Sequence, residues 1–202
     1  NRIMARGKWL LASVSLILLL GACGGGGGGS SSGNESTGVT PPSNSQLCRQ
    51  VRDQSGSRGV GVIGMCLTGN FAIQLIGDDS VLAAVASQPA MPFFNQGALH
   101  MSSADVDRSR NALDSKGSMR MLRFEADPLC TKEKSECIHR AFNNDGIQRV
   151  EEITLPGKGH SVLTLDFVDE AGHPTRRALD NVIQYFDRKL KISACLLYTS
   201  DA

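Results

Sequence analysis

The stretch that decides the fold is GVGVIGMCLTG, at residues 59–69. Its first part is apolar, β-branched and bounded by glycine, which is typical of a short strand buried on both faces, as in a parallel sheet. A segment with an apolar helical face follows, from Gly69 to Ile76. Glycines flank Cys66 at positions 64 and 69, and glycine is tolerated best where a chain reverses sharply. The stretch therefore predicts a strand–turn–helix elbow with Cys66 at its tip.

Strands and helices alternate through the rest of the chain. Apolar runs predict strands at 81–86, 119–124 and 150–155, and periodic segments predict helices at 46–54, 103–113, 132–142 and 178–190. Ser45 and Ser103 are the expected caps of the first two of these helices. This alternation implies βαβ units, and so an α/β fold with about four parallel strands and flanking helices.

The N-terminal segment, residues 1–23, has the pattern of an export signal. Basic residues precede an apolar run at 9–20, which is too short to cross a bilayer as a helix. The sequence LGAC at 20–23 is similar to the bacterial lipobox, whose cysteine is lipidated. We therefore expect a lipid anchor at Cys23 on the periplasmic side of a bacterial membrane. The alternatives are an ordinary signal peptide, or a cytoplasmic protein if the leader is an assembly artefact.

Two further segments lie outside the expected domain at 46–194. Residues 24–45 are rich in glycine and serine, which predicts a flexible tether. Residues 195–202, CLLYTSDA, look like a translated sequencing adapter. The chain is therefore interpreted as a fragment of a longer protein.

Composition excludes several classes of function. Of the 202 residues, 41% are hydrophobic, which excludes a disordered chain. A net charge of +1, without any basic run, argues against nucleic-acid binding. The cysteines include no paired C-x-x-C, so a zinc site and a thiol oxidoreductase are both disfavoured. Pairing of Cys130 with Cys137 is an alternative in an oxidising compartment.

Cys66 stands where an α/β-hydrolase holds its nucleophile. A cysteine between a strand and a helix lies at the positive end of that helix, which lowers a thiol's pKa and favours the thiolate. The backbone N–H of Leu67 would serve as one oxyanion donor. The spacing GMCLTG is one residue looser than G-x-C-x-G, and a buried structural cysteine is the alternative.

The acid and the base should follow the nucleophile in that order along the chain. Asp127 comes after the predicted strand 119–124 and suits the acid, the alternative being a turn former before Pro128. His160 lies on a loop after the strand 150–155, where this architecture presents its base, whereas an isolated loop histidine is usually a solvated surface residue.

The other three histidines fit the base less well. His100 precedes the acid strand and breaks the order, His139 lies inside a predicted helix, and His173 looks like a turn residue before the last helix. Order and placement therefore favour His160.

From about residue 47 to residue 190 the chain resembles the dienelactone hydrolase family. The resemblance is carried by GVIGMCLTG at 61–69, SQP at 87–89, LRF at 122–124 running into Asp127, GHSVLT at 159–164 and DEAGHPTR at 169–176. It implies hydrolysis of a small-molecule lactone or ester through a thioester on Cys66, with Asp127 and His160 completing the triad. No cofactor or metal is expected.

One departure from that family concerns the chain before the elbow. The family has a strand-rich first half, which carries the loop that gives a second oxyanion N–H. Here the stretch between Cys23 and Cys66 is short, and half of that stretch is tether. We therefore expect the N-terminal half of the sheet to be missing. The elbow strand would then expose an apolar edge and favour self-association. The alternative function is a non-catalytic, lipid-anchored binding or structural module.

Overall fold

The computed structural model describes residues 15–19 and 43–190. The strands are β1 (Ser15–Leu19), β2 (Val60–Met65), β3 (Val81–Ser87), β4 (Met119–Phe124) and β5 (Val150–Leu155). The helices are α1 (Asn44–Ser55), α2 (Gly69–Leu75), α3 (Ser103–Lys116), α4 (Lys132–Phe142) and α5 (Pro174–Leu190), with a 3-10 turn, η1, at Cys66–Thr68. The predicted alternation of strands and helices is confirmed.

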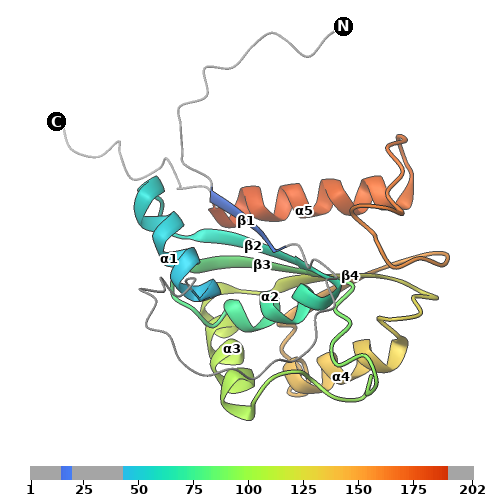
Figure 1. Cartoon of the computed structure of the whole chain (residues 1–202), viewed down its shortest axis with the longest axis horizontal. Helices are drawn as coiled ribbons and strands as arrows, with labels where there is room; N and C mark the ends of the chain where they lie inside the picture. The colour runs from blue at the N-terminus through green and yellow to red at the C-terminus, as the bar shows by residue number, and fades with distance from the viewer. Residues whose placement is uncertain (1–14, 20–42, 191–202) are drawn as a thin grey trace, which may run out of the picture.

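The five strands form one parallel sheet in the order β1-β2-β3-β4-β5. Helix α5 runs along one face of the sheet, and α1, α2, α3 and α4 lie on the other (Figure 1). Because all strands are parallel, their carboxyl ends lie at the same edge. The loops that leave this edge after β2, β3, β4 and β5 therefore share one end of the molecule.

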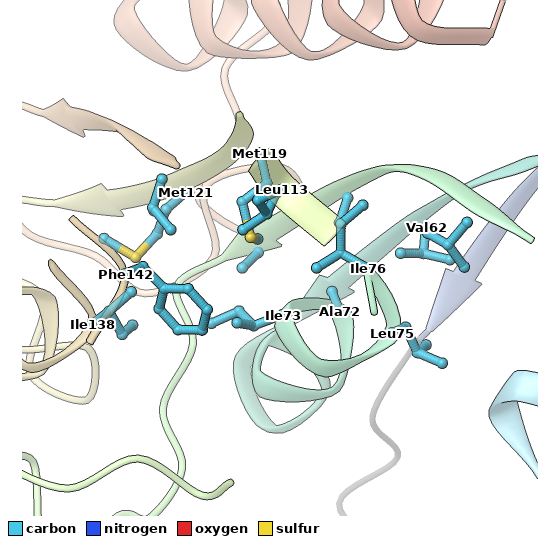
Figure 2. Packing of buried hydrophobic residues seen from close by; sticks show 14 of the residues in the cluster. Val62, Ala72, Ile73, Leu75, Ile76, Leu113, Met119, Met121, Ile138 and Phe142 are labelled. Atoms are coloured by element: carbon cyan, nitrogen blue, oxygen red, sulfur yellow. The ribbon is translucent and has the colours of Figure 1, made fainter. Parts of the chain in front are cut away.

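Two hydrophobic cores lie on the two faces of the sheet. Alternation along β4 divides them, since Met119 and Met121 belong to the core beneath α2, α3 and α4, while Leu122 and Phe124 pack under α5. Figure 2 shows the first core, where Ile73 of α2 lies near the Phe142 side chain of α4. Burial on both faces explains why the strands read as continuous apolar runs.

Side-chain caps set the starts of the helices. For α1 and α3 the predicted cap differs from the residue that caps the helix in the structure. Ser43, rather than Ser45, caps α1 in a reciprocal capping box with Gln46. Ser102, rather than Ser103, caps α3 by accepting the backbone N–H of Asp105. Both errors occur where serines cluster, because each serine can accept the same kind of bond. The closing helix also starts earlier than predicted, at Pro174, a residue favoured in a first helical turn.

The strand edge predicted to be exposed beside β2 is covered. Residues Ser15–Leu19 pair with Val60 to Gly64 in parallel register. The prediction that β2 lacks a neighbour on that side is therefore wrong for this chain. These five residues belong to the segment interpreted as the apolar part of an export signal. The same residues are therefore assigned two roles, as a strand beside β2 and as part of an export signal. Cys23 and the predicted tether up to residue 42 lie outside the described residues, as does the C-terminal tail.

The described cysteines form no disulfide. This holds for Cys48, Cys66, Cys130 and Cys137, so the alternative of a bond between Cys130 and Cys137 is wrong. Burial raises the pKa of the Cys130 thiol to about 12, with the nearby Asp127 carboxylate adding to the effect. Within the described ranges, no helix is both long and apolar enough to cross a membrane.

Candidate functional site

Cys66 lies at the tip of the elbow in a backbone conformation that side chains rarely adopt. Its φ is 56°, in the left-handed region. Gly64 makes this turn feasible, since a Cβ there would meet the backbone oxygen of Thr68 at 2.1 Å. Such strain persists only where the surrounding structure imposes it, and it is concentrated at functional sites. The predicted strand–turn–helix elbow is therefore present at Cys66.

The elbow is held by bonds on both sides. Thr68 Oγ1 accepts the N–H of Met65 at 2.9 Å and donates to the carbonyl of Met65 at 3.0 Å, which closes the turn. The carbonyl of Cys66 accepts the N–H of Ala90 at 3.2 Å, from the loop after β3. Leu67, the predicted oxyanion donor, occupies the turn directly after Cys66.

The loop after β3 is anchored from a distance. Lys134 of α4 is fully buried, and its Nζ donates to the carbonyls of Met91 and Ala98. Burial lowers the pKa of this lysine, while the neighbouring thiols Cys137 and Cys130 act in the opposite direction. Lys134 thereby holds the segment between Met91 and Ala98, which lies beside the Cys66 elbow, although the lysine is more than thirty residues further along the chain.

Asp127 and His160 meet at the same edge of the sheet. Nδ1 of His160 lies 2.8 Å from Oδ1 of Asp127. The Asp127 side chain is fully buried, and 18% of the His160 side chain is exposed. A buried carboxylate bound to Nδ1 favours the tautomer with a proton on Nδ1, which leaves Nε2 as the basic atom. This is the orientation that an acid–base pair requires.

Asp127 also organises its own turn. Besides His160, its Oδ1 accepts the backbone N–H groups of Leu129 at 2.9 Å and Cys130 at 2.8 Å. The turn-forming bonds and the contact with the His160 ring thus use the same oxygen atom of Asp127. The other oxygen, Oδ2, is buried and has no hydrogen-bond partner among the described residues.

The loop that carries His160 is shaped by Asp166. Its Oδ2 accepts the backbone N–H groups of His160 at 2.9 Å and Ser161 at 2.8 Å, and these bonds lower the pKa of the carboxyl. Gly159 allows the close approach, because a Cβ there would lie 2.8 Å from Asp166 Oδ2 and 2.8 Å from a ring carbon of Phe124. Sequence reasoning did not single out Asp166, because its bonds run to backbone groups five and six residues earlier and leave no local signature.

The three predicted residues therefore share the carboxyl edge of the sheet. Cys66 directly follows β2, whereas Asp127 and His160 follow β4 and β5. Nε2 of His160 is buried and has no hydrogen-bond partner within the described ranges, so it is not hydrogen-bonded to the thiol of Cys66. The structure brings acid and base into contact and places the thiol at the same edge.

A second polar cluster lies behind the acid, under α4. The guanidinium of Arg123 is 3.5 Å from Glu152, and Glu152 also binds His139 at 2.8 Å, Thr154 at 2.7 Å and the hydroxyl of Ser135. Burial raises the pKa of Glu152, but the hydrogen bonds from His139, Ser135 and Thr154 outweigh it and bring the pKa to about 2. Sequence analysis missed this cluster, although charged residues inside buried strands were a usable signal.

No group of three or more histidine, cysteine, aspartate or glutamate side chains in the described part of the chain is arranged to hold a metal ion. The site consists of a thiol, an imidazole and a carboxylate. Such a set suits proton transfer and nucleophilic attack at a carbonyl carbon.

Superposition on a known esterase agrees with this architecture. A Pyrococcus furiosus esterase, solved in two crystal forms, superposes with a TM-score of 0.52 and 14% identity, over 73% of this chain and 60% of the esterase. The Arabidopsis thaliana protein SOBER1 gives a TM-score of 0.48 with 12% identity, over 71% of this chain and 59% of that protein. This chain thus spans about 60% of the length of the esterase. No curated protein sequence matches it.

The sequence model of one family covers most of the described domain. Residues 43–190 match the model named dienelactone hydrolase family. The esterase superposition adds the α/β-hydrolase fold. By this match over residues 43–190, the chain belongs to the dienelactone hydrolase family.

Proposed function

We propose that the protein hydrolyses a small-molecule carboxylic ester or lactone through a thioester on Cys66. The observation that carries the proposal is the contact of 2.8 Å between His160 Nδ1 and Asp127 Oδ1, at the sheet edge where Cys66 also lies. Family membership supports hydrolytic chemistry. The strained elbow supports Cys66 as the nucleophile, because non-glycine residues held at positive φ are concentrated at functional positions.

The reaction proceeds in two halves. Nε2 of His160 takes the thiol proton of Cys66, and the thiolate attacks the carbonyl carbon to give a tetrahedral oxyanion, to which the Leu67 N–H donates. The oxyanion collapses, the bond to the leaving alkoxide breaks, and His160 returns its proton to that oxygen. The product of this half is an acyl thioester on Cys66 together with the alcohol, which for a lactone remains attached to the acyl chain as a hydroxyl group.

Water completes the cycle. His160 removes a proton from the water as its oxygen attacks the thioester carbonyl, and the carbon–sulfur bond then breaks. The thiolate of Cys66 recovers the proton and the carboxylic acid leaves. Asp127 keeps its charge throughout and stabilises the imidazolium that forms in each half.

The membrane association remains a separate proposal. The leader pattern supports a lipid anchor at Cys23 on the periplasmic side, with cytoplasmic placement as the alternative. Radiolabelled palmitate fed to producing bacteria tests it, since label should enter the wild-type protein and be absent from Cys23→Ala. Label in neither protein contradicts the anchor.

Hydrolysis is tested with p-nitrophenyl acetate. The full chain should release nitrophenol, and Cys66→Ala should lose that turnover. Cys137→Ala is the matched control, because it removes a cysteine of α4 that lies outside the elbow and forms no disulfide. Rapid acid quenching of the wild type should give an acetylated peptide containing Cys66. Equal turnover by the wild type and Cys66→Ala contradicts the thioester, and a protein without turnover favours the non-catalytic module.

A further inference from the structure

We propose that Arg123 positions the catalytic carboxylate of Asp127, and this inference rests on the proposed function. Arg123 is the second-last residue of β4, four residues before Asp127 in the chain, and only 4% of it is exposed. A buried guanidinium is costly unless its donors are satisfied. Two of the guanidinium nitrogens, Nε and Nη2, donate hydrogen bonds to the turn that carries Asp127.

Arg123 holds that turn from both ends. Its Nη2 donates to the carbonyl of Glu125 at 2.9 Å, and its Nε donates to the carbonyl of Cys130 at 3.0 Å. These carbonyls lie on either side of Asp127 in the chain. A guanidinium presents its donors in a rigid planar fork, so the two carbonyls are held at a set separation. Arg123 therefore clamps the turn without contacting His160 or the reacting atoms.

The carboxylate depends on this clamp for its orientation. Among the described residues, the side-chain hydrogen bonds of Asp127 run through Oδ1, which accepts from His160, Leu129 and Cys130. Oδ2 has no hydrogen-bond partner among the described residues, so it offers no second restraint. If the backbone at Cys130 shifts, Oδ1 follows the two amides and its contact with Nδ1 is lost.

Glu152 of the neighbouring strand keeps Arg123 in place. Its Oε1 faces the guanidinium at 3.5 Å, and its Oε2 lies 2.8 Å from Nε2 of His139. Asn143 Nδ2 lies 2.9 Å from the other ring nitrogen of His139, while its Oδ1 accepts two backbone N–H groups. Because the amide oxygen already acts as an acceptor, Nδ2 is the atom that faces the ring, while Nε2 of the ring points at Glu152. A series of contacts thus connects His139 of α4, through Glu152 and Arg123, to the turn that carries Asp127.

The same strand supplies a matched control on the other face of the sheet. Arg120 forms an ion pair with Glu151 and lies 5.0 Å from the ring centre of Tyr185 on α5. Its side chain is 11% exposed, compared with 5% for Arg123. Each arginine pairs with a glutamate of β5, but only Arg123 contacts the turn of Asp127. A purely structural role predicts similar effects for both.

The experiment compares Arg123→Met and Arg123→Lys with Arg120→Met and Arg120→Lys, all as full chains. The first readout is the downfield proton resonance of His160 Nδ1–H, assigned by its absence in His160→Gln, together with the pKa of His160 followed by NMR. The titrating groups that face His160 are Asp127 on the ring and Asp166 on the backbone, and both are retained. The second readout is kcat and KM for p-nitrophenyl acetate.

We expect Arg123→Met to lose the Nδ1–H resonance and to lower kcat by ~10²-fold with KM unchanged, as for a misplaced catalytic group. Arg123→Lys should restore part of both, because an ammonium can reach one carbonyl but lacks the fork. The Arg120 variants should keep the resonance and kcat. Retention of both in Arg123→Met, or equal losses in the Arg120 variants, overturns the proposal.

The outcomes also separate this inference from the proposed function. If the wild type hydrolyses no ester while its Nδ1–H resonance is present and disappears in Arg123→Met, the clamp stands and the hydrolase function falls. If Arg123→Met does not fold, Arg123→Lys decides the matter through the same resonance, since it retains the charge.

Discussion

Replacement of Glu152 by glutamine should destabilise the protein in a manner that depends on pH. The side chain is 13% exposed, and its pKa falls from the usual 4.5 to about 2 because bonds from His139, Ser135 and Thr154 outweigh the effect of burial. Each pKa unit corresponds to about 1.4 kcal/mol, so the ionised group stabilises the folded chain by about 3 kcal/mol at neutral pH. Glutamine keeps the volume of the side chain and removes its charge.

The sign follows from the direction of the shift. A folded-state pKa below the unfolded value gives stability that is fully present above about 4.5 and lost as the pH falls towards 2. Glu152→Gln should therefore be less stable than the wild type by about 3 kcal/mol at pH 7, and the difference should shrink to about 1 kcal/mol near pH 2.5.

The assay is urea unfolding followed by far-ultraviolet circular dichroism at several pH values. Glu136→Gln is the control, because Glu136 is 53% exposed and faces the exposed Lys132 at 3.7 Å. Its effect should stay below about 1 kcal/mol at each pH. A difference for Glu152→Gln that does not change between pH 7 and pH 2.5 refutes the reasoning.

Two further changes test the packing around the site. Gly64→Ala should cost about 3 kcal/mol, the upper end for overpacking, and abolish turnover, because the new Cβ would lie 2.1 Å from the Thr68 carbonyl oxygen; a urea midpoint equal to that of the wild type contradicts this. Tyr185→Phe should cost about 1–2 kcal/mol, since its hydroxyl accepts the N–H of Ala84 and donates to the carbonyl of Ser118 at 3.1 Å; unchanged unfolding would show that these bonds add nothing.

Local sequence patterns predicted most of the architecture. The strands at 119–124 and 150–155 and the helix at 132–142 were placed at the residues where the structure has them. Their periodicity is a property of neighbouring residues, so it can be read without knowledge of the fold. The chain order of thiol, carboxylate and imidazole likewise placed Cys66, Asp127 and His160 at one edge, because parallel strands end on the same side.

The sheet neighbour of β2 could not be predicted in this way. Residues Ser15–Leu19 form a strand that pairs with Val60 to Gly64. The same apolar run satisfies the pattern of an export signal, and a short apolar run carries no information on which partner it will find. The error over the exposed edge thus came from reading one segment by its local pattern alone.

By itself, the sequence determined the elbow, the α/β alternation and the three residues proposed for catalysis, since these depend on local turn chemistry and on chain order. The tertiary structure alone decided which groups support them. Arg123 donates to the carbonyls of Glu125 and Cys130 on either side of Asp127, and Glu152 on the adjacent strand β5 forms an ion pair with Arg123. The physical reason is that these contacts depend on which face of the sheet each side chain takes and on the register of β4 with β5, and both emerge only when the sheet assembles.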